Sequence, residues 1–229
     1  MRNLFLVSIL PATALLGATF AQSADWLTIP RERLCVTEGA LEKAGNGRMS
    51  VSVPKMRAYV SEGTGQSAEV RFTYLGGTSK ESALGSGAMR RQFGLKLHAQ
   101  DPCNLVYAIW RIEPESKLVV SVKRNPQAHR SAECGNRGYQ NIKPSKASSV
   151  PRLIPGQSHT LRAEMQRDEL RVFVDNHEVW EGSVGADAAA LAGPVGIRSD
   201  NTQLEFDFKA QKLEGSTGQG KSCETGDSD

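Results

Sequence analysis

The chain has 229 residues, with 28 Lys and Arg against 25 Asp and Glu, which gives a formal net charge of +3. This near balance, together with the lack of a motif that combines basic and aromatic residues, argues against a nucleic-acid-binding protein. The content of 22 Gly and 10 Pro, with 6% aromatic residues, favours a turn-rich β-protein over a helical one.

Residues 1–23 have the pattern of a secretory signal. Arg2 supplies the positive charge, residues 4–16 form an apolar core, and small residues near Ala21 and Ser23 form two cleavage sites. The apolar stretch is too short and too interrupted for a membrane span, although an uncleaved anchor is the alternative. The sequence therefore predicts a secreted or periplasmic protein with no membrane span after signal cleavage.

The length of residues 24–213 suits one sandwich-type domain as well as two small ones, and one β-sandwich domain is expected because no clear linker marks a boundary. Its first strands are predicted over 24–35, 48–53, 57–60 and 68–75, and the last of these alternates Val70, Phe72 and Tyr74 with polar residues. A loop rich in Gly and Ser follows over 76–87. Long loops of this kind are often functional, although plain mobility is the alternative.

The middle of the chain predicts a hairpin followed by a polar excursion. After a strand over 93–98, strands over 105–113 and 117–123 are joined by a turn that begins at Pro114. Residues 124–156 are polar, contain four prolines and have little periodicity. Residues 111–152 contain nine Lys and Arg and only three Glu, so this region is strongly basic.

The last strands are predicted over 160–165, 170–174, 178–181 and 203–213. Asp175-Asn176 suits a tight turn that needs positive φ angles. Residues 214–229 are a polar tail that contains Cys223.

The stretches VFVDNHEVWEG, GPVGIRSD and LEFDFKAQKL carry a resemblance over roughly the last 55 residues of the domain. They are similar to the C-terminal half of concanavalin A-like and laminin-G-like jelly rolls, and especially to a bacterial 3-keto-disaccharide hydrolase-like module of unknown function. The resemblance implies an all-β, two-sheet antiparallel jelly-roll sandwich. The residues expected to fill its core or pack on its faces are Phe173, Trp180, Val195, Ile197, Phe206 and Phe208.

Four cysteines in an exported chain favour two disulfides, for which there are three pairings. No two cysteines have the short spacing of a zinc site. Sandwiches of the resembled type often place the first and last strands side by side, which implies a bond between Cys35 and Cys223. Cys103 and Cys134 flank the predicted hairpin and form the second expected pair.

Glu205-Phe206-Asp207 is the one fragment that looks catalytic. Retaining glucanases of the laminarinase type on this fold use Glu-x-Asp-x-x-Glu, and this chain has Ala210 where the last glutamate would stand. Two-carboxylate glycoside chemistry therefore lacks its second partner. No catalytic residue is assigned.

The basic and aromatic residues upstream predict a glycan-binding surface instead. Aromatic faces stack on sugar rings, and charged groups orient them. The function expected is binding of an acidic or neutral carbohydrate without cleavage. A polyuronate lyase, a glycoside hydrolase and a structural envelope or protein-interaction domain are the alternatives. The candidate ligand-binding residues are His98, Tyr107, Trp110, Arg111, Lys123, Arg137 and Tyr139.

Calcium is common on the resembled fold and is the one cofactor considered. Asp175, Asn176, Asp200 and Asn201 offer oxygen ligands in loops, although such residues often serve the turn alone. The histidines share no metal-binding spacing, and no other cofactor is expected.

Overall fold

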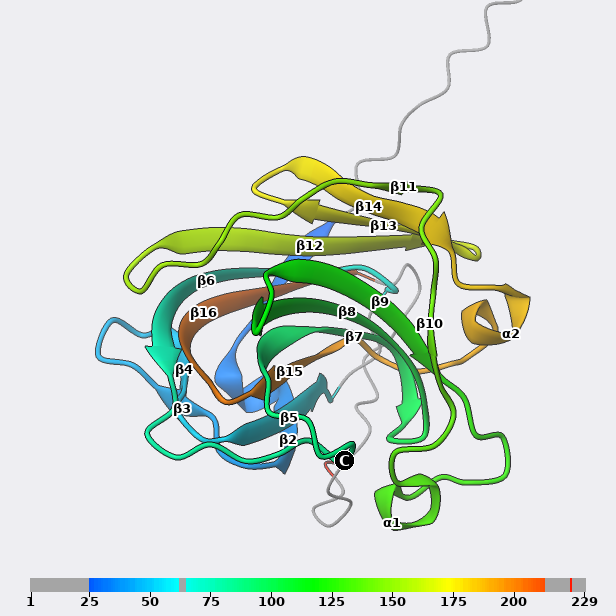
Figure 1. Cartoon of the computed structure of the whole chain (residues 1–229), viewed down its shortest axis with the longest axis horizontal. Coiled ribbons are helices and arrows are strands. Elements are labelled where there is room, and N and C mark those ends of the chain that lie inside the picture. Colours follow the sequence, from blue (N-terminus) through cyan, green and yellow to red (C-terminus); the bar gives the residue numbers. More distant parts are fainter. Residues whose placement is uncertain (1–24, 62–64, 213–222, 224–229) are drawn as a thin grey trace, which may run out of the picture.

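The computed structural model describes residues 25–61, 65–212 and 223. They form two antiparallel sheets packed face to face (Figure 1), which is the predicted sandwich. The predicted signal and the tail other than Cys223 lie outside the described residues. Among the described residues, no helix is long and apolar enough to cross a membrane.

Sheet A contains nine strands, and β1 (Trp26–Ile29) joins it by pairing with β16. Its other strands, in spatial order, are β11 (Lys146–Ala147), β14 (His177–Ser183), β13 (Glu169–Val174), β12 (Ser158–Gln166), β6 (Ala68–Gly77), β16 (Thr202–Gln211), β4 (Met49–Val51) and β3 (Glu42–Lys43).

Sheet B contains seven strands. In spatial order they are β10 (Tyr139–Asn141), β9 (Lys117–Lys123), β8 (Asn104–Glu113), β7 (Arg91–Asp101), β15 (Gly196–Asp200), β5 (Lys55–Val60) and β2 (Leu34–Glu38). The described helices are short: η1 (Arg31–Arg33), α1 (Ser131–Cys134) and α2 (Ala186–Ala189).

Period-two alternation places the apolar face of each sheet between the layers. Phe72 of sheet A meets Phe93 of sheet B with ring centroids 4.3 Å apart, and Trp110 lies 5.7 Å from Phe72. All three side chains are fully buried. The inward face of β8 is therefore used by the core, and the residues between its inward positions face outward from sheet B.

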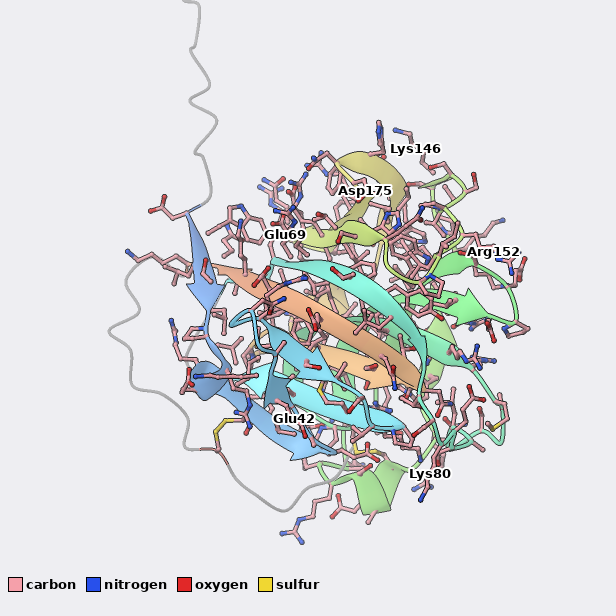
Figure 2. All side chains as sticks on the ribbon, turned by 90° about the vertical axis from the view of Figure 1, so that its left-hand side faces the viewer. Glu42, Glu69, Lys80, Lys146, Arg152 and Asp175 are labelled. Atoms are coloured by element: carbon pink, nitrogen blue, oxygen red, sulfur yellow. A yellow bond between two sulfur atoms is a disulfide. The ribbon has the colours of Figure 1, made fainter. Side chains whose placement is uncertain are left out.

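The outer face of sheet A is covered by interleaved charges. Figure 2 shows this side of the molecule, with Glu69 among the outward side chains. Glu69 lies 3.8 Å from Arg162 and 3.6 Å from Lys209. Opposite charges alternate here, so no single sign of charge accumulates.

Phe173 is not a core residue. On β13 the inward positions are Val172 and Val174, so the intervening side chain must point outward. Its ring lies under the Arg162 guanidinium, whose carbon is 4.6 Å from the ring centroid. The other five core candidates (Trp180, Val195, Ile197, Phe206 and Phe208) are buried.

Residues 124–156 contain two short strands that the sequence pattern did not indicate. β10 pairs with β9 at the edge of sheet B, and β11 pairs with β14 at the edge of sheet A. The segment therefore runs along one side of the sandwich from one sheet to the other (Figure 1). Gly196–Asp200, which is not among the strands predicted from the sequence, forms the interior strand β15 between β7 and β5.

Two disulfides join Cys35 to Cys223 and Cys103 to Cys134, which are the two pairs expected from the sequence. The first ties β2 to a residue beyond the end of β16. The second ties the turn before β8 to α1, so it fixes the start of the long excursion against sheet B.

Two glycines allow close approach of the strands in sheet B. A Cβ atom at Gly94 on β7 would lie 2.2 Å from the carbonyl oxygen of Ala108 on β8. A Cβ atom at Gly196 on β15 would lie 2.2 Å from the carbonyl oxygen of Ala58 on β5. Glycine in a strand interior commonly marks such approaches of one backbone to another.

We therefore expect Gly94→Ala to lower the free energy of unfolding by about 1–3 kcal/mol, because backbone atoms must move to admit the methyl group. Gly45→Ala is the matched control, since a Cβ atom there has no neighbour within 4 Å. Urea unfolding of both variants checks this expectation. Equal stability of the two variants would contradict the close approach.

Candidate functional site

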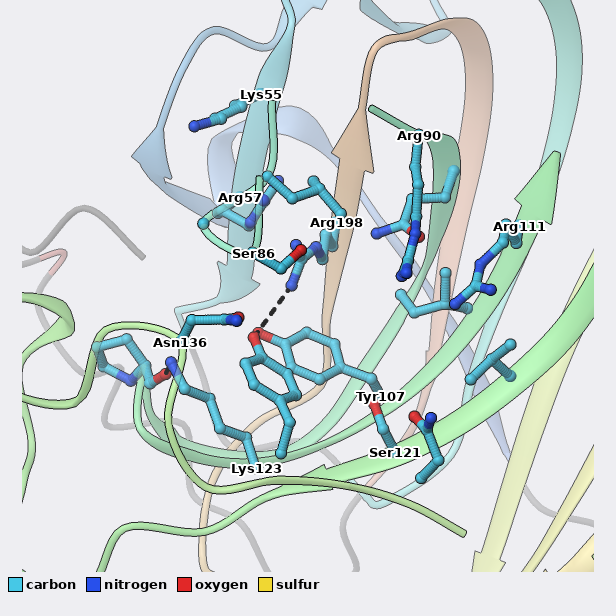
Figure 3. Close-up of a pocket in the computed structure, with 18 of the residues that line it drawn as sticks. Lys55, Arg57, Ser86, Arg90, Tyr107, Arg111, Ser121, Lys123, Asn136 and Arg198 are labelled. Carbon is cyan, nitrogen blue, oxygen red and sulfur yellow. Dashed lines mark hydrogen bonds between the residues drawn. The ribbon is translucent and has the colours of Figure 1, made fainter. Parts of the chain in front are cut away.

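A cavity of about 460 Å³ lies on the outer face of sheet B (Figure 3). This volume is in the range of pockets that hold small ligands. Strands β5, β15, β7, β8, β9 and β10 form its floor. Among the lining residues are Lys55, Arg57, Gln92, Tyr107, Arg111, Ser121, Lys123, Tyr139, Asn141 and Arg198.

Two loops form the walls of the cavity. One is the 84–90 loop, which contributes Leu84, Gly85, Ser86 and Arg90. It is held by Asn201, whose Nδ2 donates to the carbonyl oxygens of Ser82 and Arg90, each at 2.9 Å. The Gly- and Ser-rich loop is thus hydrogen-bonded to the end of β15.

The other wall comes from α1 and the residues after it, including Asn136. The Cys103–Cys134 disulfide holds this wall against sheet B. Asn104, which is fully buried, adds to it: its Oδ1 accepts from the Asn125 amide, and its Nδ2 donates to the Ala128 carbonyl, both at 2.9 Å.

Asp200 organises the centre of the floor. Arg57 and Arg198 face each other on neighbouring strands, and like charges in such positions repel. Asp200 lies 2.5 Å from Arg57 Nη2 and 2.8 Å from Arg198 Nε, and it accepts a third hydrogen bond from Gln92 at 2.9 Å. One buried carboxylate thus holds two arginines and one amide.

The charges around Asp200 keep it ionised. Its burial opposes ionisation, but Arg198, Arg57 and the Gln92 hydrogen bond outweigh this effect and lower the pKa from 3.8 to about 2. Burial alone would lower the pKa of Arg198, and Asp200 instead raises it well above its usual value. Both groups are charged throughout the physiological range.

Two tyrosines stack beside this centre. The rings of Tyr107 and Tyr139 lie 6.0 Å apart at 20°. Arg198 lies 5.2 Å from the centre of the Tyr107 ring and donates to the Tyr139 hydroxyl at 3.3 Å (Figure 3). Lys123 lies 5.2 Å from the centre of the Tyr139 ring. Tyr107 is buried, whereas Tyr139 is 38% exposed and accessible to a ligand.

Arg90 and Arg111 occupy the other end of the cavity (Figure 3). Neither guanidinium has a hydrogen-bond or ion-pair partner among the described residues, and the buried Nε of Arg111 is left unsatisfied. Burial and the nearby charge of Arg90 lower the pKa of Arg111, and Glu115 offsets part of this. Two cations are therefore held close together without a counter-charge in contact.

None of the described residues that line the cavity is Asp or Glu. The acid pair of the sequence, Glu205 and Asp207, lies on β16 in sheet A. There Asp207 accepts from Arg48 Nε at 3.1 Å, and Glu205 accepts from Asn46 at 2.9 Å. These carboxylates stabilise the outer face of sheet A and do not face the cavity.

Four of the seven predicted ligand-binding residues line the cavity: Tyr107, Arg111, Lys123 and Tyr139. Arg137 does not line it; its guanidinium donates to the carbonyl oxygens of Glu133 and Cys134. Arg137 follows the lining residue Asn136 in the segment that forms one wall, but its side chain does not line the cavity.

His98 and Trp110 were wrongly placed on the binding surface. Trp110 points inward because it alternates with the outward residue Arg111. His98 is fully buried, with Nδ1 2.6 Å from the Leu191 carbonyl oxygen, and burial lowers its pKa. Neither side chain is exposed to an external ligand.

The residues that sequence reasoning missed come from other strands. Arg57 and Arg198 belong to β5 and β15, and they are 141 positions apart in the sequence. Lys55 and Arg57 alternate with buried Met56 and Ala58, and this period of two was the one available signal. Strand order, which joins β5 to β15, is not visible in that signal.

The residues proposed for calcium lie in two separate turns. Asp175 accepts from the Thr160 amide at 2.8 Å and lies 2.7 Å from His159 Nδ1, while Asp200 is held by arginines. Within the described residues, no group of three or more His, Cys, Asp or Glu side chains could hold a metal. Calcium was the one possibility beside the expectation of no cofactor, and neither has been tested.

Comparisons with known proteins show which solved structures have a similar fold. No family model and no curated protein matches the chain. Among solved structures, it is similar to the carbohydrate-binding module CBM66 from Bacillus subtilis, with 12% identity and a TM-score of 0.53, covering 76% of this chain and 91% of that one. This likeness shows the jelly-roll sandwich fold, in agreement with a concanavalin A-like architecture.

Two further structures have TM-scores below 0.5. The Emp46p carbohydrate recognition domain has a TM-score of 0.49 at 12% identity, covering 80% of this chain and 89% of that one. The Crh5 transglycosylase in complex with NAG has a TM-score of 0.48 at 10% identity, covering 85% and 87%. These weaker likenesses carry no argument about the site.

The depressed pKa of Asp200 predicts a pH dependence of stability. Because the folded pKa lies below the unfolded one, the stabilisation is present above pH 3.8 and is lost as the pH falls through about 2. The ionised form of Asp200 thus contributes about 2 kcal/mol to the free energy of unfolding. We expect Asp200→Asn to remove this acid-sensitive part of the unfolding free energy. The change also leaves Arg198 without an ion-pair partner and Arg57 with only Glu38, at 3.8 Å, so it should destabilise the protein by about 3–5 kcal/mol at neutral pH.

Denaturant unfolding between pH 7 and pH 2 measures both effects. Asp187→Asn, on an exposed position of α2, is the control for loss of a carboxylate. An Asp200→Asn variant as stable as the control at pH 7 would show that the carboxylate does not hold the site together.

Proposed function

We propose that the protein is an exported carbohydrate-binding module that binds a glycan in the cavity of sheet B and does not cleave it. The observation that carries this proposal is the stacked pair of Tyr107 and Tyr139, set among hydrogen-bonding side chains in one cavity. Aromatic rings provide flat apolar surfaces, and nearby polar groups fix the orientation of a bound ring.

The polar lining suits sugar hydroxyl groups. Ser121 and Asn141 are directly opposite each other on β9 and β10, and Tyr107 is opposite Ser121 on β8. Asn136 on the wall adds a second amide. These side chains offer both donors and acceptors, which hydroxyl groups need in order to exchange water for protein contacts.

The architecture supports the same proposal. The Bacillus subtilis structure with the same fold is a carbohydrate-binding module, although the likeness itself extends to the fold alone. Two disulfides suit a protein that works in an oxidising compartment outside the cytosol. Export remains inferred from these bonds and from the signal pattern of residues 1–23.

The residues of the cavity favour glycan binding over glycan cleavage. Two-carboxylate hydrolysis requires an acid and a second carboxylate, and the described lining holds neither. A lyase would require a base, but burial raises the pKa of Tyr139, so its phenolate is scarce at neutral pH. Binding requires neither group.

We expect Tyr139→Ala to weaken glycan binding about tenfold, which corresponds to about 1.4 kcal/mol. Tyr139 lies on the edge strand β10 and is partly exposed, so the fold should survive the change. Phe173→Ala is the control, since it removes an aromatic ring from the outer face of the other sheet.

Affinity electrophoresis and calorimetry with soluble polygalacturonate, its carboxyl-reduced form, alginate and arabinan measure the effect. Absorbance of new unsaturated ends and of released reducing ends is recorded in parallel. Failure to bind any polymer, or turnover of one of them, would overturn the proposal.

A further inference from the structure

Arg90 and Arg111 are the two arginines that line the cavity without an ion-pair partner among the described residues. Other arginines close to them have carboxylate partners. Arg91, the residue after Arg90, lies 2.6 Å from Glu81 and 2.8 Å from Glu113. Arg57 and Arg198 share Asp200. Among the described arginines that line the cavity, only this pair therefore lacks a carboxylate in contact.

The backbone of each of these two residues is anchored. The carbonyl of Arg90 is fixed by Asn201, and Arg111 lies in the middle of sheet B on β8, directly opposite Gln92. Two like charges in a half-buried site repel each other, and the unsatisfied Nε of Arg111 adds the cost of an unmade hydrogen bond. An anion between them would remove both costs.

From this geometry we infer that Arg90 and Arg111 form a subsite for the carboxylate or sulfate group of an acidic sugar. The inference rests on the proposed function and specifies the class of glycan. Guanidinium groups present planar pairs of N–H donors that match the oxygens of such anions, and charge-assisted hydrogen bonds of this type are stronger than neutral ones.

The surroundings favour an acidic sugar over a free inorganic anion. The cavity extends from the arginine pair to the stacked tyrosines, so one ligand has room for both a ring and its charged group. Lys55 and Lys123 add positive charge along the same floor. No carboxylate stands in the described lining, and the buried Asp200 beneath it is shared by two of its cations, so positive charge is in excess and favours anionic polymers over neutral ones.

The test compares polygalacturonate with its carboxyl-reduced form, which has the same linkages without the charge. We expect the purified full chain to bind the acidic polymer at least tenfold more tightly, with affinity that falls as salt is raised from 50 to 500 mM. Arg111→Gln should reduce this preference by tenfold or more. Arg111→Lys, which keeps the charge but loses the planar pair of donors, should fall between the two.

Arg171→Gln is the matched control, because it removes an arginine from an exposed position of β13 in the other sheet. It should bind both polymers as the unchanged protein does. A sulfated galactan in a parallel series distinguishes a sulfate from a carboxylate as the preferred group, and either preference supports the subsite if Arg111→Gln abolishes it.

Three results would overturn the inference. If both polymers bind equally and Arg111→Gln changes neither, the cavity binds glycans without a charge subsite, and the proposed function alone survives. If inorganic sulfate or phosphate competes at concentrations equal to those of polymer uronate units, the site takes free anions. If no polymer binds, the proposed function fails as well.

Discussion

The carboxylate of Asp200 is the contact on which the cavity depends. Arg57 and Arg198 face each other across two strands, and without an anion between them their repulsion would separate the side chains that form the floor. Asp200 also accepts from Gln92, so it links β15 to β7 as well as to β5. A buried ion pair is costly to form, and it is maintained here by several hydrogen bonds to each charged group.

This network explains why the two ends of the cavity differ. At the centre, Arg198 is paired with Asp200 and its guanidinium lies over the Tyr107 ring. The resulting cation–π contact helps to hold the two tyrosines in place. At the other end, Arg90 and Arg111 have no such partner among the described residues. The structure therefore separates cations that hold the site together from cations that are available to a ligand.

The covalent framework supports the same region. The Cys103–Cys134 bond holds the wall that carries Asn136, and Asn201 holds the opposite loop. Neither wall is a regular strand, so each depends on these few contacts to keep its shape. Both walls come from polar segments whose sequences have little periodicity. Periodicity alone therefore predicts no regular structure for them.

Most of the fold could be predicted from the sequence. Period-two strands must bury one face each, which suits the two-layer sandwich that the resemblance implied. The alternation in 105–113 sets Val106, Ala108, Trp110 and Ile112 on one face of the strand and Tyr107 and Arg111 on the other, but both faces carry bulky side chains. The structure shows that the first face is buried in the core, so Trp110 lies there and not on the binding surface.

Only the tertiary structure decided which outward residues meet. Arg57, Arg90 and Arg198 join Tyr107 and Arg111 because antiparallel pairing sets β5, β15, β7 and β8 side by side. Strand order depends on the long-range packing of both sheets, whereas periodicity is a local property of each strand. For that reason the sequence by itself determined the layers and the faces, and the composition of the cavity followed from contacts between segments more than a hundred residues apart.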